Sequence, residues 1–483
     1  MNARAVPPVP TTRPPEQLPA AALPLESGDG IPVVVTSERE VPHILRDPIG
    51  RVVLRVALPA VGSTLLITLF AAFDTFWVGT YVGSAGLAAV TISLFWIWLI
   101  ISIAEMVSIG LTAVAARRHG ERRSEDAAVA VGNALVVSVG LGVIVALAGH
   151  LWLDAIFAAM NTPAAVTALG RAYLGTYLWA APLLFGFFAV DAAFRSSGDT
   201  RTPLLLLAAS VAVTLVLDPV LILGLLGAPE LGIRGAAVAT ITTRSVVFVA
   251  GLVMLRRRGL IRWRGFDWPT IAAMCRIGAP TAVTGVMFSL IYVLVTRTAT
   301  GFGTSAIAAL GLGHRIESWL YMIGVGFGAA AAAIVGQNLG ARQPDRAARA
   351  GWVTAAYATT PGVIFWALAL TIPAQLAAIF TGDPAVVAEA ANYLRIGAWS
   401  ELTICAEVVL EGALGGAGHT LPPMLTSTLI TASRVPIAIW AAARWGPTGI
   451  WWTISITAIV RALAMVWIWQ RGGWKRRAVF RPA

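Results

Sequence analysis

Long apolar stretches alternate with short polar breaks along the chain from Arg51 to Gln470. A helix needs about 20 mostly apolar residues to cross the hydrocarbon layer of a bilayer, which is about 30 Å thick. The pattern therefore predicts an all-α polytopic membrane protein with twelve transmembrane helices. The predicted spans are residues 51–80, 85–116, 124–150, 167–193, 203–227, 232–255, 270–300, 304–336, 345–372, 385–414, 422–443 and 447–470.

Two terminal segments differ from the apolar middle of the chain. Residues 1–48 are rich in Pro, with Ser, Thr, Glu and Arg between, and contain no apolar stretch of the kind that a signal peptide requires. We interpret them as a disordered, Pro-rich cytoplasmic tail, although such a segment also suits the binding of a partner domain. Residues 471–483 form a second, basic cytoplasmic tail.

Basic residues fall mainly on one side of the predicted membrane. Alternate polar breaks and the C-terminal tail hold most of them, namely Arg117, Arg118, Arg122, Arg123, Arg195, Arg201, Arg256, Arg257, Arg258, Arg262, Arg264, Arg342, Arg346, Arg349, Arg471, Lys475, Arg476, Arg477 and Arg481. The opposite breaks hold few, namely Arg171, Arg234 and Arg444. Because cytoplasmic loops carry an excess of Arg and Lys, we expect a multi-pass protein of the cell (plasma or inner) membrane with both termini in the cytoplasm. The net charge of +11 then reflects topology and does not indicate a nucleic-acid partner.

Composition excludes several other classes of protein. Charged residues make up 12% of the chain, about half the share in soluble domains, and hydrophobic residues make up 57%. The only lysine is Lys475, so no phosphate-binding P-loop and no ATPase site is present. The two cysteines, Cys275 and Cys405, lie far apart in apolar stretches and form neither a disulfide framework nor a metal site. The sequence also lacks His-Glu-x-x-His and Gly-x-Ser-x-Gly, and we expect a protein that is not an enzyme.

The chain contains an internal repeat. A shift of 220 positions aligns Gly83-Ser-Ala with Gly303-Thr-Ser, Gly120 with Gly340, Arg122 with Arg342, Tyr173 with Tyr393, and Gly198-Asp-Thr with Gly418-His-Thr. Each half holds six predicted spans, an even number, so both halves enter the membrane from the same side and are related by an axis along the membrane normal. We predict an N-terminal six-helix lobe over residues 49–265 and a C-terminal six-helix lobe over residues 266–470, around a central cleft.

Two acidic residues at membrane depth are the main functional candidates. Asp74 and Asp218 lie roughly 9 and 13 Å from the outer ends of the first and fifth predicted spans. Thr240 reaches a similar depth in the sixth span, and Thr214 lies one turn below Asp218 on the same face. Ionisable groups at this depth are costly and mark ion or substrate pathways. The four side chains suit coupling to H⁺, or to Na⁺ held at Asp74 and Asp218, and the alternative is a structural pair of hydrogen-bonded acids.

Prolines near these acids are candidates for conformational roles. Pro219 leaves the carbonyl of Leu215 without its helical donor, which makes that oxygen a further possible ligand. Pro59 lies 15 residues before Asp74 in the same span. A proline inside a long transmembrane helix marks a kink or a hinge, so Pro59 is either a hinge coupled to Asp74 or a static bend.

The C-terminal lobe carries a different set of charged residues. Glu317 and Arg315 in the eighth span, Glu401 in the tenth and Arg434 in the eleventh fall at membrane depth, and they suit either structural salt bridges or contact with substrate. Near the cytoplasmic ends lie Glu105, Asp191, Glu407 and Glu411. For these four we expect solvated or paired structural roles, with arginines of the cytoplasmic loops as partners.

Several short motifs, taken in their order along the chain, resemble those of the multidrug and toxic compound extrusion (MATE) family, in particular its prokaryotic DNA-damage-inducible-like branch. They are Ala-Leu-Pro59, Asp74-Thr-Phe-Trp-Val-Gly, Gly83-Ser-Ala-Gly-Leu-Ala-Ala, Arg195-Ser-Ser-Gly-Asp-Thr-Arg-Thr-Pro203, Leu-Asp218-Pro219, Gly232-Ile-Arg-Gly-Ala-Ala-Val-Ala-Thr240, His-Arg315-Ile-Glu317-Ser and Val335-Gly-Gln-Asn-Leu-Gly-Ala341. The resemblance covers roughly residues 45–470.

The resemblance implies a function. Members of the family are secondary active antiporters that export amphipathic and cationic organic compounds in exchange for H⁺ or Na⁺, without a cofactor. By resemblance, Asp74 and Asp218 are the coupling carboxylates, Thr240 is a neighbouring ligand, and bending at Pro59 follows protonation. Related proteins often carry Asn where this chain has Thr214, and the loss of an amide oxygen favours H⁺ over Na⁺. We expect small-molecule drugs as substrates, the lipid bilayer as surroundings and a monomer as the working unit.

Two other functions remain as alternatives. A lipid-linked oligosaccharide or lipid flippase of the same broader superfamily requires a cationic cavity for phosphate groups, for which Arg297, Arg315, Arg434 and Arg461 are available. The alternative of a different class is an intramembrane enzyme, which the missing catalytic motifs disfavour.

Overall fold

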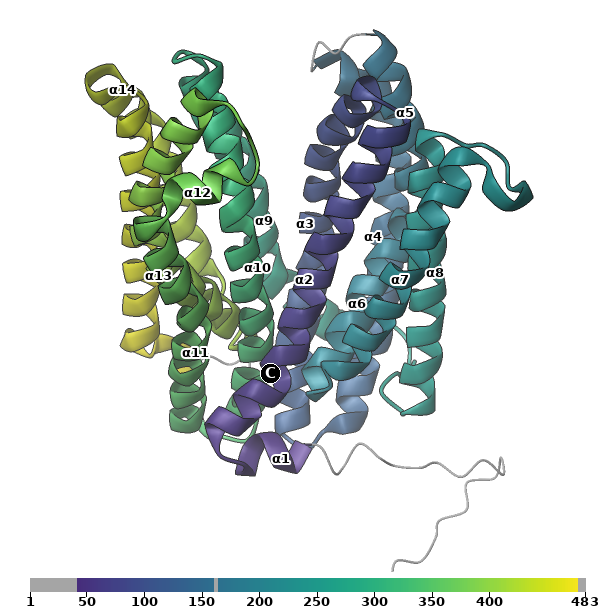
Figure 1. The fold of residues 1–483 in the computed structure, drawn as a ribbon. Helices are drawn as coiled ribbons and strands as arrows, with labels where there is room; N and C mark the ends of the chain where they lie inside the picture. The colour runs from purple at the N-terminus through teal and green to yellow at the C-terminus, as the bar shows by residue number, and fades with distance from the viewer. Residues whose placement is uncertain (1–40, 160–163, 477–483) are drawn as a thin grey trace, which may run out of the picture. The chain divides into compact units, whose positions relative to one another are not determined.

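The computed structural model describes residues 41–159 and 164–476, and this part of the chain is helical and contains no strand (Figure 1). The helices are α1 (Val41–Arg46), α2 (Ile49–Tyr81), α3 (Ser84–Gly120), α4 (Ser124–Ala159), α5 (Ala164–Trp179), α6 (Ala181–Ser197), α7 (Arg201–Leu223), α8 (Ile233–Arg257), α9 (Trp268–Thr300), α10 (Thr304–Gly340), α11 (Pro344–Thr371), α12 (Pro373–Ala378), α13 (Pro384–Gly416) and α14 (Leu421–Arg471). Short 3₁₀ turns cover Leu225–Gly227 and Gly473–Arg476.

The twelve predicted spans are confirmed as helices. Within the described residues, nine helices are long and apolar enough to cross a membrane, and the pair α5–α6, bent by 52°, forms a tenth span. Helix α14 is 51 residues long and holds two of the predicted spans, because the backbone breaks at Gly446, where φ is 61°. Helix α13 is 33 residues long but carries Glu and Arg side chains, so hydropathy alone does not identify it.

The predicted tails, residues 1–48 and 471–483, each include one short helical element. Residues 1–40 and 477–483 lie outside the described residues, but α1 and the turn Gly473–Arg476 are ordered and packed. Ile44 in α1 is buried, and Arg346 donates a hydrogen bond to its carbonyl oxygen at 3.1 Å. Trp474 is fully buried and stacks on Trp469 with ring centroids 4.0 Å apart. One apolar side chain in each segment, Ile44 or Trp474, therefore packs against the helix bundle. The charge and proline content of these segments did not indicate such packing.

The internal repeat appears in the helix boundaries. Helices α3, α4 and α7 begin at residues 84, 124 and 201, and α10, α11 and α14 begin at 304, 344 and 421, each 220 positions later. The left-handed turn residues repeat in the same way: φ is 86° at Gly83 and 92° at Gly303, and 60° at Arg122 and 58° at Arg342. These positive φ angles explain why the two halves match best at their turns.

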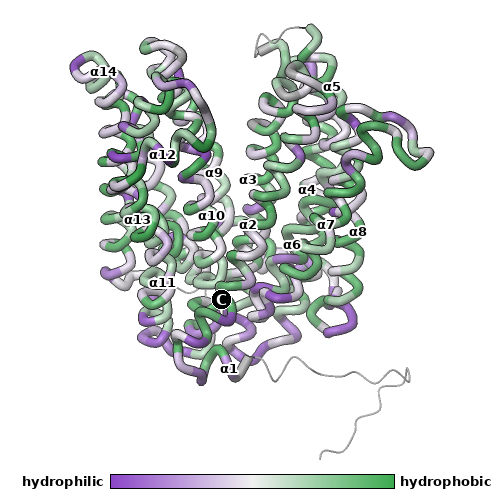
Figure 2. The backbone as a smooth tube through the Cα atoms, in the orientation of Figure 1, coloured by the Kyte–Doolittle hydropathy of each residue, from purple (hydrophilic) through white to green (hydrophobic). Residues whose placement is uncertain are grey.

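We call helices α2–α8 the N-lobe and helices α9–α14 the C-lobe. Figure 2 shows hydrophilic positions gathered at the end of the bundle near α1, which we call the α1 end, while hydrophobic positions run along the helices. Close contacts between the lobes lie toward this end. A β-carbon at Gly120 would overlap the carbonyl oxygen of Gln337, and one at Gly340 would overlap that of Arg117. The glycines therefore let α3 and α10 cross with their backbones in contact.

Candidate cation-coupling site

Asp74 and Asp218 lie on two helices of the N-lobe that are otherwise almost wholly apolar. Asp74 is on α2 and 6% exposed, and Asp218 is on α7 and fully buried. Pro219 follows directly inside α7, so the turn that carries Asp218 lacks one backbone donor. The two predicted acids therefore face the interior of the lobe.

Tyr173, which the sequence analysis did not assign to the site, contacts one of the two acids. The hydroxyl of Tyr173 on α5 donates a hydrogen bond to Asp74 Oδ2 at 3.2 Å. Asp218 lies within electrostatic range of both Asp74 and Tyr173. Among the described residues, neither carboxylate oxygen of Asp218 has a hydrogen-bond partner, nor does Asp74 Oδ1. A buried carboxylate with so few donors is stable only when it gains a proton or a cation.

Of the two predicted threonine ligands, Thr214 lies one turn before Asp218 on α7, and Thr240 lies on α8. The hydroxyl of Thr214 is 2.7 Å from that of Thr243 on α8 and also donates to the carbonyl of Ser210 at 2.8 Å. Thr243 lies nearly one turn after Thr240 on α8, and its hydroxyl is the one that meets Thr214 on α7. No hydrogen bond in the described part of the chain joins Thr240 Oγ1 to either carboxylate.

Arg244 is a charged residue that the sequence analysis missed. Its guanidinium lies over the rings of Phe70 on α2 and Phe187 on α6, at 5.8 and 5.2 Å from their centroids. It is within electrostatic range of Tyr177 and Asp191. An Arg in an apolar span, one turn after Thr240, is the sequence feature that identifies Arg244 as a candidate. A fixed cation thus stands between the helix of Asp74 and that of Asp191.

Pro59 lies inside α2, which stays helical from Ile49 to Tyr81. Two tertiary hydrogen bonds flank it. Thr200 donates to the carbonyl of Val56 at 2.8 Å, and Thr64 donates to the carbonyl of Met322 on α10 at 2.7 Å. The second bond links the lobes. A hinge at Pro59 remains a prediction, and these contacts anchor the helix on both sides of it.

The C-lobe contains a related arrangement around Glu317. The hydroxyl of Tyr393 on α13 donates to Glu317 Oε2 at 2.9 Å, and Tyr393 is the repeat mate of Tyr173. Glu401 is 2% exposed, its Oε2 lacks a partner among the described residues, and it lies within electrostatic range of Glu317. Two of the predicted C-lobe residues, Glu317 and Glu401, therefore lie within electrostatic range of each other, and Tyr393 donates to the first.

The two predicted arginines of the C-lobe behave differently from each other. Arg434 is buried and donates to Thr457 Oγ1 at 2.9 Å and to the carbonyl of Ile454 at 3.4 Å. It lies within electrostatic range of Glu317 but forms no ion pair with it in the described residues. Arg315 is exposed although it is only two positions from Glu317, because residues so spaced lie on different faces of a helix.

Comparison with known proteins agrees with this architecture. The MatE family model matches the chain twice, over residues 59–220 and 280–440. A probable multidrug resistance protein NorM from Thermotoga maritima is 28% identical over 456 residues, which cover 92% of this chain and 96% of that protein. An FAD transporter from Shewanella oneidensis is 25% identical over 434 residues, covering 89% of this chain and 96% of that protein.

A solved structure shares the fold. A crystal structure of a variant of the MATE transporter VcmN from Vibrio cholerae superposes with a TM-score of 0.82 at 20% sequence identity, covering 89% of this chain and 99% of that one. The two segments that match the family model make up more than half of the sequence, one in each lobe. The resemblance inferred from the motifs is confirmed: the chain belongs to the MatE family of multi-pass membrane transporters.

Proposed function

We propose that the protein is a secondary active multidrug efflux antiporter. It exports amphipathic or cationic organic compounds in exchange for H⁺, or for Na⁺, by alternating access between two lobes that span residues 49–265 and 266–470. It works as a monomer in the cell membrane with both termini, and hence the α1 end, in the cytoplasm, and it needs no cofactor.

The observation that carries the proposal is the buried pair of Asp74 and Asp218 in one lobe. Neither acid has a basic partner among the described residues, and Tyr173 supplies the single hydrogen bond that they receive. Two desolvated carboxylates in electrostatic range repel each other when both are ionised. An entering ion relieves that repulsion and disfavours a bound organic cation, so ion and drug compete for the lobe.

The surroundings of the acids favour H⁺ over Na⁺. A Na⁺ site needs several oxygen ligands that converge on the ion. Here the hydroxyl of Thr214 is engaged by Ser210 and Thr243, and the hydroxyl of Thr240 contacts neither acid. A proton requires no such ligand shell. We therefore assign H⁺ as the coupling ion and Asp74 and Asp218 as the groups that carry it.

Dye uptake into inverted membrane vesicles, in which an exporter pumps its substrate into the lumen, tests the proposal. We expect an imposed pH gradient, and not an imposed Na⁺ gradient, to drive transport. Asp74→Asn and Asp218→Asn should each abolish it while expression stays intact. Asp154→Asn is the matched control, because Asp154 is exposed and pairs with Arg171 near the far end of α4. Full transport by both acidic-site variants would refute the mechanism.

The flippase alternative receives less support. Arg461 forms an ion pair with Glu407, and Arg434 donates its hydrogen bonds to Thr457 and Ile454. Of these two arginines, Arg461 has its charge neutralised by Glu407, whereas Arg434 donates only to uncharged groups. A lipid-scrambling assay in proteoliposomes separates the two functions, since the antiporter should leave the lipids unscrambled.

A further inference from the structure

Helix α1 lies between the two lobes at the α1 end. Its Ile44 side chain is 6% exposed, and a β-carbon at Gly198, which ends α6 in the N-lobe, would lie 2.5 Å from Ile44 Cδ1. Ile44 also belongs to one buried apolar cluster with Leu339 on α10 and Ala347 on α11. One side chain of α1 therefore contacts the N-lobe and forms part of the apolar core of the C-lobe.

Arg346 fastens α1 to the C-lobe. From the first turn of α11, its Nη2 atom donates to the carbonyl oxygens of Ile44 at 3.1 Å and of Asp47 at 2.5 Å. The last carbonyl groups of a helix have no donor within that helix, and a basic side chain can supply one. Arg346 therefore caps the C-terminal end of α1 from the opposite lobe.

Two contacts beside α1 extend this connection. A β-carbon at Gly50, in the first turn of α2, would lie 2.6 Å from Tyr357 Oη on α11. The side chain of Gln337 on α10 donates to the carbonyl oxygen of Ser196 on α6 at 2.8 Å. The start of the N-lobe is thus held against the C-lobe, and both contacts must break when the lobes separate at this end.

The linker between the lobes makes the matching contact in the other half of the repeat. Pro48, just before α2, and Pro269, in the first turn of α9, are 221 positions apart. The linker before Pro269 lies on α4 of the N-lobe, where the amide of Arg262 donates to the carbonyl of Ala128 at 3.0 Å. Helices α4 and α11 begin 220 positions apart, so each segment crosses to the equivalent helix of the other lobe.

The two crossings differ in how they are held. The linker is covalently joined to α8 in the N-lobe and to α9 in the C-lobe. The hold of α1 on the C-lobe rests on noncovalent contacts, namely the packing of Ile44 and the two hydrogen bonds from Arg346. Such contacts can break and re-form in each transport cycle, so α1 is the crossing that can be released.

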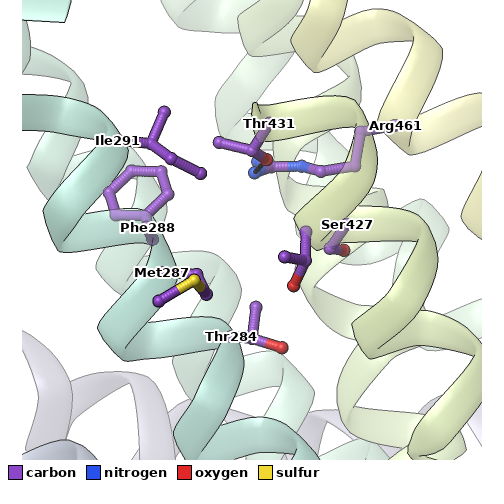
Figure 3. Close-up of a pocket in the computed structure, with 8 residues that line it drawn as sticks. Thr284, Met287, Phe288, Ile291, Ser427, Thr431 and Arg461 are labelled. Carbon is purple, nitrogen blue, oxygen red and sulfur yellow. Dashed lines mark hydrogen bonds between the residues drawn. The ribbon is translucent and has the colours of Figure 1, made fainter. Parts of the chain in front are cut away.

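The C-lobe is closely packed inside. A cavity between α9 and α14 has room for about one water molecule (Figure 3). Arg461, from the second half of α14, donates to Thr431 Oγ1 in the first half at 3.2 Å and forms an ion pair with Glu407 on α13. These contacts tie α13 and α14 together. Opening at the α1 end therefore requires the two lobes to separate from each other, and α1 crosses the place where they part.

We propose that α1 is a latch that holds the lobes together at the α1 end, and that Arg346 is the positioning residue that fastens it. Release of α1 from α11 is then a required step before the transporter opens on that side. The proposal rests on the efflux function and on its two-lobe alternating access, to which it adds a device that sets how often the α1 end opens.

The test is the distance between two nitroxide spin labels, measured by double electron–electron resonance in the purified full-length protein in lipid nanodiscs. The labels are placed by Arg201→Cys and Leu421→Cys, with Cys275→Ala and Cys405→Ala. Positions 201 and 421 are the exposed first residues of α7 and α14 and are repeat mates, one in each lobe. No drug and no ion gradient is present, so the result does not depend on antiport.

We expect Arg346→Ala to raise the ratio of the separated to the closed population at least about tenfold, because it removes two hydrogen bonds from a charged donor. Arg346→Lys should reverse part of this change, and Ile44→Asp should reproduce it. Arg349→Ala is the matched control, since Arg349 is an exposed residue of α11 without a hydrogen bond or ion pair among the described residues. An unchanged distance distribution in both Arg346→Ala and Ile44→Asp, or an equal change in the control, would overturn the proposal.

A second measurement follows α1 itself and does not depend on the stability of the Arg346→Ala protein. A single thiol is placed at buried position 44 by Ile44→Cys, or at position 43, where the histidine side chain is 56% exposed, by His43→Cys. With Arg346 intact, maleimide should label position 44 at least about tenfold more slowly than position 43. Arg346→Ala should bring the two rates together. Equal rates while Arg346 is intact would show that α1 is not docked and would refute the latch.

These results are separable from the vesicle assay of the antiport mechanism. Loss of transport in the Asp74→Asn and Asp218→Asn variants leaves the label distances and labelling rates as tests of α1 alone. A latch that fails both measurements leaves the exchange at the two acids untouched.

Discussion

Tyr173 and Tyr393 are 220 positions apart, and each donates its phenol hydrogen bond to a carboxylate of its own lobe. The acceptors, Asp74 and Glu317, are not repeat mates: they lie on α2 and α10, the first helix of the N-lobe and the second of the C-lobe. The tyrosine donor is therefore at the same position in both repeats, whereas the acidic acceptor lies on a different helix in each lobe. A tyrosine that can stabilise an ionised acid is therefore a shared part of both lobes, while the acids differ.

The tyrosine of the N-lobe should contribute to coupling. Tyr173→Phe removes the one hydrogen bond that Asp74 receives from a side chain, and a hydrogen bond to a charged acceptor contributes about 1.5–3 kcal/mol. We expect dye export driven by a fixed pH gradient to fall roughly tenfold with normal expression. Tyr393→Phe is the control and should have a smaller effect. Equal losses in the two variants would show that the tyrosines act through stability alone.

The glycine crossing between the lobes should resist any added side chain. Gly120→Ala and Gly340→Ala each place a methyl group against a backbone carbonyl, so we expect the closed arrangement to lose about 1–3 kcal/mol. The melting temperature in detergent should fall and export should slow, because α3 and α10 then favour separation at the α1 end. Gly140→Ala faces open space and should leave both quantities unchanged. A wild-type melting temperature in all three variants would contradict the close crossing.

Arg244 should matter through its planar shape as well as its charge. Its guanidinium lies over two phenylalanine rings, a geometry that an ammonium group reproduces poorly. Arg244→Gln should lower pH-driven export several-fold, and Arg244→Lys should recover only part of it. Initial rates in inverted vesicles, normalised to protein amount, check this. Full recovery by Lys would show that charge alone is required.

The C-terminal turn should stabilise the C-lobe. Trp474 is fully buried, stacks on Trp469 and donates to its carbonyl oxygen at 2.9 Å. We expect Trp474→Ala to lower the free energy of unfolding by about 3–5 kcal/mol, a value typical of a buried aromatic side chain. Trp445→Ala, at a side chain that is 58% exposed, is the control. A smaller shift for Trp474→Ala than for the control in a thermal melt would refute this role.

The sequence alone predicted much of the fold, and the reason is physical. Apolar stretches long enough to span a bilayer define the helices, and turns at left-handed residues such as Gly83 and Arg342 preserve the repeat. The burial of Asp74 and Asp218 followed from their depth in apolar spans. The packing of short segments, such as α1 and the turn at Trp474, could not be predicted in this way. One buried side chain is a weak signal in a polar or Pro-rich stretch.

Contacts between helices were beyond the sequence. Thr240 and Thr243 lie less than one turn apart on α8, and only the packing of α7 decides that Thr243 meets Thr214. Tyr173 was visible as a repeated residue, but nothing in its spacing indicates that it reaches Asp74. We expected loop arginines as partners of Glu407, but its partner in the structure is Arg461 on α14. Depth along a helix can be counted from the sequence, but the direction of a side chain around it cannot.

In the proposed mechanism, Asp74 and Asp218 exchange a bound ion for the drug. Proton release on ligand binding tests it most directly: saturating tetraphenylphosphonium is added to the purified protein in weakly buffered, Na⁺-free solution that contains a pH indicator. We expect release of about one proton per bound cation by the wild-type protein, and none by the Asp74→Asn, Asp218→Asn protein. The same release from both proteins would contradict this exchange, because the protons would then come from other groups.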